Sequence, residues 1–224
     1  MAAHPHLADE LGPVAVDAVD DDDEWVDALV TGDLAGAVVD GLHLRRSRLD
    51  GVVLTGAEIE RLRADDVVFD ACDLSGALLP EASLRRVLFR GCRMRGVVLA
   101  GARLEDVRFE ACRLDDASLR MVRGARVELE DCALVDADLY EAVLTGARVI
   151  DCDLTRASLD RADVSEARLT GSILDDVTGR ATLRGTWLDS TQLVPFARWQ
   201  AASLGARLLD HEPDDEPRAR VDGG

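Results

Sequence analysis

The chain lacks lysine and is poor in aromatic residues and histidine. All 26 basic residues are Arg, aromatic residues make up 4% of the 224 residues, and there are four His. Because a globular core normally takes its bulk from aromatic side chains, small aliphatic residues must here fill a narrow interior. Only His43 lies in the body of the chain, and it has no evident nucleophilic partner. The sequence therefore predicts a protein that is not an enzyme and has no catalytic residues.

Long apolar runs and a leader-like segment are also missing. No run approaches the roughly 18 apolar residues that span a bilayer, so we expect no membrane segment. The first thirty residues lack a basic region followed by an apolar one. Five cysteines fit a reducing compartment if their thiols are free. We expect a soluble, cytoplasmic protein.

Acidic residues are concentrated at the two ends. Of the 44 acids, nine lie in residues 1–30 and six in residues 210–224, which leaves 29 acids and 24 Arg in residues 31–209. The formal net charge of −18 is therefore mainly a property of the ends. Since acidic segments with little apolar surface do not fold alone, we expect disordered acidic tails at residues 1–24 and 211–224.

A period of five residues runs through the body of the chain. Every fifth residue from Leu34 to Leu174 has a large apolar side chain, with two exceptions, Ala64 and Gly124. Of these 29 positions, 19 are Leu. The residue two places earlier is Ala, Val or Cys at most positions, and neither set contains a charge. Neither a helix nor a flat strand has this period. A chain that turns by a quarter every five residues would point both sets at one axis.

Two residue types repeat every twenty residues, which is the length of one square coil. The cysteines form one such column: Cys72, Cys92, Cys112, Cys132 and Cys152. The phenylalanines form another: Phe69, Phe89 and Phe109. Coils stacked by backbone hydrogen bonds about 4.8 Å apart would place each column on one side of the coil.

Several five-residue units resemble the pentapeptide-repeat family, whose consensus is Ala/Cys, Asp/Asn, Leu/Phe, any residue, Gly. Examples are CDLSG (72–76), ARLED (102–106) and CDLTR (152–156), and the pattern covers at least residues 32–176. The resemblance implies an all-β fold, a right-handed quadrilateral parallel β-helix of about seven coils. We place it at residues 25–193, with Leu29 continuing the frame at its start and a frame slip near 179–180.

The C-terminal end changes period. Residues 194–210 predict a short α-helical cap and a last strand, because apolar residues follow helical spacing and Gly205 could end the helix. A solenoid needs its open end covered, so Phe196, Trp199 and Leu204 are candidate cap contacts. Resemblance to the quinolone-resistance members of the family implies the alternative, a homodimer formed through this end.

The cysteine column is not expected to bind metal or to form disulfides. Parallel side chains in a line cannot close a tetrahedral zinc shell or converge on one another. Cys behaves here as a small apolar residue. We therefore predict no metal and no cofactor.

The charge pattern bears on two kinds of partner, DNA gyrase and nucleic acid. The family's known DNA mimics imply binding to DNA gyrase, and one acidic line remains here: Asp50, Asp70, Glu110, Glu130 and Asp151. One edge instead alternates in sign: Arg46, Asp66, Arg86, Asp106 and Arg126. Such pairs neutralise one another, which opposes mimicry. The Arg-rich band at residues 85–126 lacks outward aromatic residues to stack on bases, so no nucleic acid is expected.

The remaining interpretation is a rigid scaffold for an unknown protein partner. Outward positions hold apolar residues on one side, namely Val38, Leu78, Val98, Met121 and Tyr140, and on another side Val68 and Leu88. Clustered exposed apolar residues can mark a contact surface. The plainer alternative is that β-branched residues simply suit strands.

Overall fold

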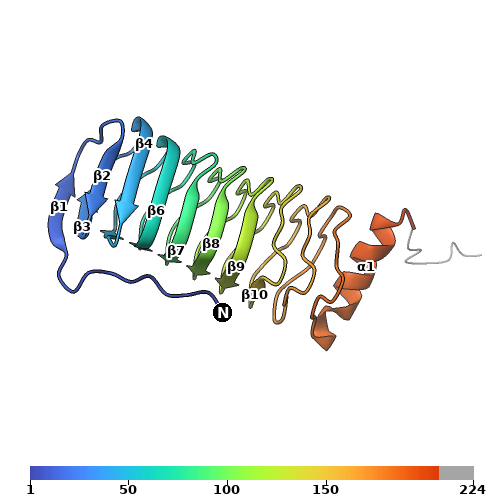
Figure 1. Ribbon diagram of the computed structural model, residues 1–224. Helices are drawn as coiled ribbons and strands as arrows, with labels where there is room; N and C mark the ends of the chain where they lie inside the picture. Colours follow the sequence, from blue (N-terminus) through green and yellow to red (C-terminus); the bar gives the residue numbers. More distant parts are fainter. Residues whose placement is uncertain (207–224) are drawn as a thin grey trace, which may run out of the picture.

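The computed structural model describes residues 1–206, and it is a single coiled rod (Figure 1). Ten strands form one parallel sheet in the order β1-β3-β5-β6-β7-β8-β9-β10, with β2 and β4 paired to each other and β4 to β6. The strands are β1 (Gly12–Val16), β2 (Asp23–Val26), β3 (Ala28–Gly32), β4 (Val38–Arg45), β5 (Arg48–Asp50), β6 (Glu58–Asp70), β7 (Ser83–Arg90), β8 (Arg103–Glu110), β9 (Arg123–Glu130) and β10 (Arg148–Ile150). The expected β-helix is confirmed as a parallel solenoid of about seven turns.

From β4 and β5 onward the register between successive coils is twenty residues, whereas β1 pairs with β3 at an offset of sixteen and β2–β4 and β3–β5 pair at nineteen. Phe69 pairs with Phe89 and Phe89 with Phe109, and the isolated bridges beyond the strands keep the same offset as far as Ser158 and Thr178. Parallel pairing at this offset places equivalent residues of each unit directly above one another. The predicted columns are therefore vertical columns of the fold.

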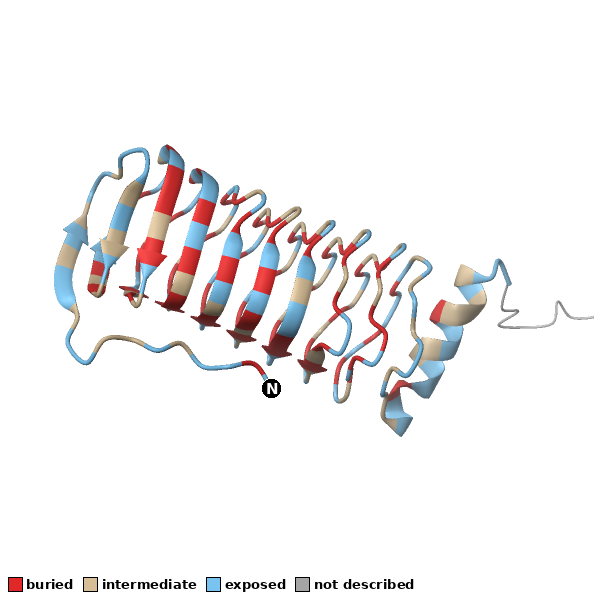
Figure 2. Ribbon diagram, viewed as in Figure 1, coloured by how far each residue is buried: buried red, intermediate tan, exposed pale blue. Residues whose placement is uncertain are grey.

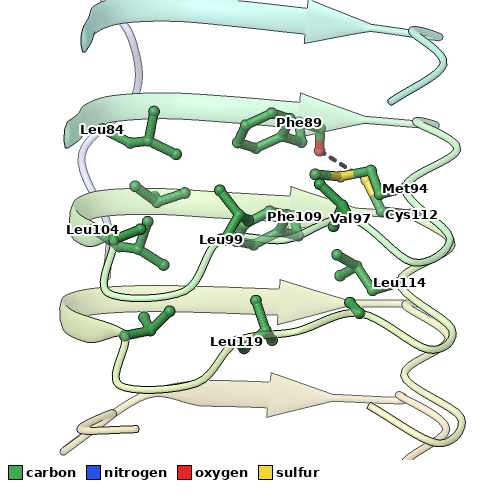
Figure 3. Close-up of a cluster of buried hydrophobic side chains, with 14 of the residues drawn as sticks. Leu84, Phe89, Met94, Val97, Leu99, Leu104, Phe109, Cys112, Leu114 and Leu119 are labelled. Atoms are coloured by element: carbon green, nitrogen blue, oxygen red, sulfur yellow. Dashed lines mark hydrogen bonds between the residues drawn. The ribbon is translucent and has the colours of Figure 1, made fainter. Parts of the chain in front are cut away.

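The two columns are buried inside the coil. Figure 2 shows buried segments recurring from strand to strand along the rod, and Figure 3 shows Phe89, Phe109 and Cys112 among the buried side chains. The ring centroids of Phe69 and Phe89 are 4.6 Å apart and those of Phe89 and Phe109 are 4.9 Å apart, with the rings stacked. All five cysteines are buried and free. The thiol of Cys112 donates to the carbonyl of Phe89 at 3.4 Å, a bond drawn in Figure 3. The Cys side chain in the small apolar position thus also donates a hydrogen bond to a buried carbonyl.

The corners of the coil take two forms. In one form the amide of the small apolar residue donates back to the preceding inward residue, as Ala147 does to Leu144 at 3.0 Å. In the other form the corner stays part of a strand, as at Val67 and Val87 within β6 and β7. At the corner before the Phe column, Val keeps the backbone extended, as β-branched residues prefer. At other corners Val97 and Val122 close the turn as Ala147 does, donating to Met94 and Leu119.

The N-terminal end differs from the expected disordered tail. β1 pairs with β3, and β2 pairs with β4, so residues 12–16 and 23–26 extend the sheet. Val14, Val16, Val19 and Trp25 pack against the core. These few apolar residues cover the first coil while the acids face outward. The average composition of the segment, which predicted disorder, did not reveal this arrangement. The frame also shifts by one here, because Val30, and not Leu29, is fully buried.

The C-terminal end matches the expected slip and helical cap over the residues described. Bridges change from an offset of twenty, at Ser158 and Thr178, to nineteen, at Asp163 and Thr182. Gly179 has a φ of +88°, and a Cβ there would lie 2.3 Å from the amide nitrogen of Asp160, so only glycine fits the slip.

A 3-10 turn, η1 (Ser190–Gln192), leads into helix α1 (Leu193–Ser203), which covers the last coil (Figure 1). The predicted last strand and the tail at 211–224 lie outside the described residues. Within residues 1–206, no helix has the length and apolar character needed to cross a membrane.

Candidate interaction surface

The reactive side chains are enclosed in the core. The hydrogen bond with the Cys132 thiol, with burial adding to it, raises the pKa of Cys112 to about 12, and both neighbouring thiols raise the pKa of Cys92, so these two thiols remain protonated. Across residues 1–206, no group of three or more His, Cys, Asp or Glu is arranged to hold a metal ion. All five cysteines are 2% exposed or less, so the column packs within the core and presents no surface to a partner.

The proposed acidic line is broken in the structure. Asp50, Asp70, Glu110 and Glu130 share one column, which also contains Arg90. The next residue of this column is Ile150, so Asp151 lies one position away from it and the expectation for Asp151 is wrong. Asp70 is bound by Arg48 and Arg90, and the hydrogen bond from Arg90 lowers its pKa. The line is therefore not a continuous row of free charge.

The edge that alternates in sign forms a ladder of ion pairs. Arg86 contacts both oxygens of Asp66 at 2.6 Å, and Nε of Arg126 lies 2.6 Å from Oδ1 of Asp106. The hydrogen bond from Arg126 lowers the pKa of Asp106 to about 2. Bidentate pairs of this kind hold the carboxylates in one orientation. Arg46 pairs in the same way with Asp27, and with this sixth residue the edge is neutral overall.

One predicted apolar pair is not free to meet a partner. Val68 and Leu88 point outward from β6 and β7, yet each is only 8% exposed. Residues 1–11 run along this side of the rod from β1 toward β9 (Figure 1). The amides of Ala2 and Ala3 donate to side chains of β9 and β8. Outward apolar residues in successive coils were a signal that something covers them, but the sequence did not show what.

The other predicted apolar side keeps an exposed patch. Leu78 is 38% exposed and bridges to Val98 on the next coil. Pro80 and Ala100 lie two residues further along the same two coils and are half-buried. These four residues, Leu78, Pro80, Val98 and Ala100, are called the apolar patch below. Its flat shape follows from the sheet, since outward residues of stacked coils stand side by side.

The more distant apolar residues on this side do not join the apolar patch. Val38 is 74% exposed but is separated from Leu78 by Glu58 in the same column. Met121 is exposed on its own. The ring of Tyr140 lies between two guanidinium groups, 4.4 Å from Arg120 and 5.5 Å from Arg161.

The C-terminal candidates divide between cap and surface. Trp199 is buried, its Nε1 donates to the carbonyl of Gly179 at 2.8 Å, and its ring meets Phe196 edge-on at 5.9 Å. Both residues therefore serve the cap. Leu204 is 79% exposed and is not part of the core. Leu193 and Val194, at the start of α1, are also exposed.

Three features define a pentapeptide-type β-solenoid. They are a coil of twenty residues, inward columns of Leu, Phe and Cys, and corner residues with a positive, left-handed φ, such as Arg86 and Asp106. Two family models agree with this class: a pentapeptide repeat region matches residues 42–119, and pentapeptide repeats in eight copies match residues 137–176. Together they cover 118 of the 224 residues. The chain belongs to the pentapeptide-repeat family, whose members are typically structural or interaction proteins.

Two solved structures illustrate what this chain is similar to, and the first supports the fold. Full-length QnrB1, a plasmid-mediated fluoroquinolone resistance protein, is 19% identical, with 84% of this chain and 99% of that chain covered and a TM-score of 0.50. HetL, a pentapeptide repeat protein involved in heterocyst differentiation regulation in Nostoc sp. strain PCC 7120, is 24% identical, with 75% and 84% covered and a TM-score of 0.28. No curated protein matches the sequence significantly. At these identities the likeness is one of fold.

Proposed function

We propose that this protein is a non-enzymatic, cytoplasmic scaffold that binds another protein through the outside of its rod. The observation that carries the proposal is the apolar patch, Leu78, Pro80, Val98 and Ala100, exposed or half-buried on a face without loops. The five free cysteines support a reducing compartment.

The rigidity of the face favours binding. Backbone hydrogen bonds run from coil to coil beneath the apolar patch, for example from Val98 to Ala77 at 2.9 Å and from Leu79 to Val98 at 2.8 Å. A partner therefore orders little of this surface when it binds, and the entropic cost of association is reduced. A small apolar centre with polar surroundings is the usual composition of the energetic core of an interface.

The test is affinity purification of the tagged full chain from its native cells. The double variant Leu78→Asp and Val98→Asp places two charges in the apolar patch without touching the core. We expect it to recover at least about tenfold less of the partner than the wild type, as loss of a central contact does. The matched control is Ser118→Asp with Ser158→Asp, which lies in the same outward column beyond the apolar patch.

The control should recover the partner as well as the wild type does. Equal recovery by all three chains would show that the apolar patch is not the binding surface. If the wild-type chain recovers no protein that an untagged control lacks, the scaffold function itself is wrong.

Binding to DNA gyrase is a separate outcome that the charges oppose. The alternating edge is neutralised by Arg86–Asp66 and Arg126–Asp106 pairs, whereas a replica of DNA needs unpaired negative charge. We expect no effect on gyrase supercoiling and no protection from a fluoroquinolone at micromolar protein. Protection in that assay would contradict the charge argument.

The C-terminal end is the proposed place for a homodimer if one forms. Because Trp199 is buried in the cap, a second copy would have to cover Leu193, Val194 and Leu204, which are exposed around α1. Light scattering coupled to gel filtration measures the mass of the full chain. A dimer that becomes a monomer in Val194→Glu would support this contact, and a dimer unaffected by it would place the contact elsewhere.

A further inference from the structure

The first residues of the chain form an arm that lies across the coils. The amide of Ala2 donates to Oε1 of Glu128 at 2.9 Å, that of Ala3 to Oδ1 of Asp106 at 3.0 Å, and that of His6 to Oδ1 of Asp66 at 3.0 Å. The three acceptors lie in β9, β8 and β6. The arm is thus held to the rod by its backbone and not by the identity of its side chains.

The spacing of the acceptors matches an extended chain. Asp66 and Asp106 are two coils apart, which corresponds to about 9.6 Å at the usual interstrand distance. Ala3 and His6 are three residues apart, and an extended chain covers about 10 Å in three residues. The solenoid therefore offers two carboxylates at an interval that fits amides three residues apart in an extended peptide.

The acceptors are fixed in place before any peptide arrives. Arg86 and Arg126 each bind both oxygens of their partners, Asp66 and Asp106, and their Nε atoms share Oδ1 with the arm amides. Nε of Arg108 lies 3.0 Å from Oε2 of Glu128, whose side chain is 9% exposed. Each carboxylate keeps lone pairs for the arm, and preorganised acceptors lose little entropy on binding.

The floor between the acceptors is formed by two apolar residues, Val68 and Leu88, and by Arg108. Val68 and Leu88 point out of the solenoid and are 8% exposed beneath the arm, whereas Val38 and Leu78 on the opposite side of the coil are uncovered. The arm places only small or modest side chains here: Ala2 is buried, and Pro5 and Leu7 are half-buried. Nη1 of Arg108 lies 2.9 Å from Nε2 of His4, the one close polar contact made by an arm side chain on this floor.

We propose that this groove, formed by Asp66, Val68, Leu88, Asp106, Arg108 and Glu128, is a docking site for an extended peptide segment of a partner protein. The arm is its intramolecular occupant. The partner segment has small or aliphatic, uncharged side chains and free backbone amides in place of those of Ala2, Ala3 and His6. This inference rests on the proposed scaffold function and names the chemistry of a partner.

The arm regulates the groove through its tether. A short flexible connection gives an attached segment an effective concentration in the millimolar range. A partner peptide must therefore bind better than the arm or meet a chain whose arm has been released. An arm that only braces the solenoid would give no binding in trans, and this is the competing outcome.

The test uses a fluorescent synthetic peptide with the sequence of residues 1–11 and the full chain carrying Ala2→Pro and Ala3→Pro. Proline has no amide hydrogen, so the two bonds to Glu128 and Asp106 are lost while the coils are unchanged. We expect saturable binding by fluorescence polarisation, at least about tenfold tighter than to the wild-type chain, whose own arm competes. Ala8→Pro is the matched control, since the Ala8 amide makes no hydrogen bond in the structure, and it should behave like the wild type.

Two further probes show that the binding uses this groove. Adding Leu88→Arg to the double-proline chain should abolish binding. A peptide with N-methylated Ala2 and Ala3 keeps every side chain but lacks both donors, and should bind at least about tenfold more weakly, as loss of hydrogen bonds to charged acceptors does.

A double-proline chain that keeps its circular dichroism and unfolding transition but does not bind the peptide would overturn the proposal and leave the arm as a brace. If that chain unfolds, Ala3→Pro alone is measured, and binding no tighter than to the wild type overturns the proposal equally. Loss of the groove proposal with normal partner recovery in native cells leaves the scaffold function standing. Absence of any recovered partner removes the scaffold function, whatever the peptide does.

Discussion

The two halves of the solenoid have the same repeat but differ in the backbone form of one corner. Between residues 58 and 130, the corner before the Phe column carries Val67, Val87, Val107 or Val127, and β6 to β9 run through it as continuous strands. In the later coils the same corner carries Ala147 and Ala167, whose amides close hydrogen-bonded turns. The period of five fixes the coil, and at this one corner Val accompanies the strand form and Ala the turn form.

The two halves also differ in core packing and in surface charge. The first half stacks three Phe rings and pairs Arg with Asp along its edge. Residues 131–176 carry eleven acids against four Arg. An internal space of about 30 Å³ there is lined only by apolar side chains, Leu134, Leu139, Leu144, Leu154 and Leu159 among them. Because dispersion contacts are lost at a void, we expect the second half to be the less stable one.

The largest expected effect is on the Phe column. Phe89→Ala removes the ring between Phe69 and Phe109 and should cost about 3–5 kcal/mol in the free energy of unfolding. Leu159→Ala, beside the existing space in the other half, should cost less, about 2–3 kcal/mol. Guanidinium unfolding followed by circular dichroism measures both. Equal losses would mean that the two halves are packed equally well.

A smaller effect is expected from pH. The pKa of Asp106 is held at about 2, below its ordinary value of 3.8, by the hydrogen bond from Arg126. Because the folded value is the lower one, this stabilisation is present above about pH 4 and is lost as the pH falls toward about 2. Asp106→Asn should cost about 1–2 kcal/mol at pH 7 and flatten the acid side of the stability curve.

The matched change in the second half is Asp136→Asn. Its partner pair with Arg156 is exposed, so the effect should be smaller. Stability curves of the two variants that fall in parallel with the wild type below pH 4 would show that neither pair is responsible for acid sensitivity.

The smallest effect should be a gain. Ala71 and Ala111 occupy exposed corners with φ of 51°, a left-handed conformation that costs a residue with a Cβ. Ala71→Gly and Ala111→Gly should each stabilise the protein by about 0.5–1 kcal/mol. Ala133→Gly is the control, because Ala133 has no positive φ and should lose about 0.5–1 kcal/mol. A loss at all three positions would show that the corners carry no such strain.

The sequence predicted the repeating part of the fold well because inward residues obey a strict period. The Cys and Phe columns, the frame slip near Gly179 and the helical cap all follow from side chains that must be buried or glycine that must be present. The corner types were not predicted, since Val and Ala both satisfy the inward pattern and differ only in backbone preference.

The outside of the rod was harder to predict. The arm binds through the amides of Ala2, Ala3 and His6, and backbone donors leave no mark on composition. Asp151 was assigned to the acidic line although it lies one position beyond the column of Glu130 and Ile150. Outward residues are free to be polar or apolar, so the apolar patch could be suggested by Leu78 and Val98 but not delimited.

The central claim is that twenty residues make one coil, so that residues twenty apart are vertical neighbours. Anomalous scattering from the sulfur atoms of a crystal of the full chain locates all five thiols at once. The account predicts that those of Cys72, Cys92, Cys112, Cys132 and Cys152 form a buried line with steps of about 4.8 Å. Sulfur positions that are scattered, or that face solvent, would contradict it.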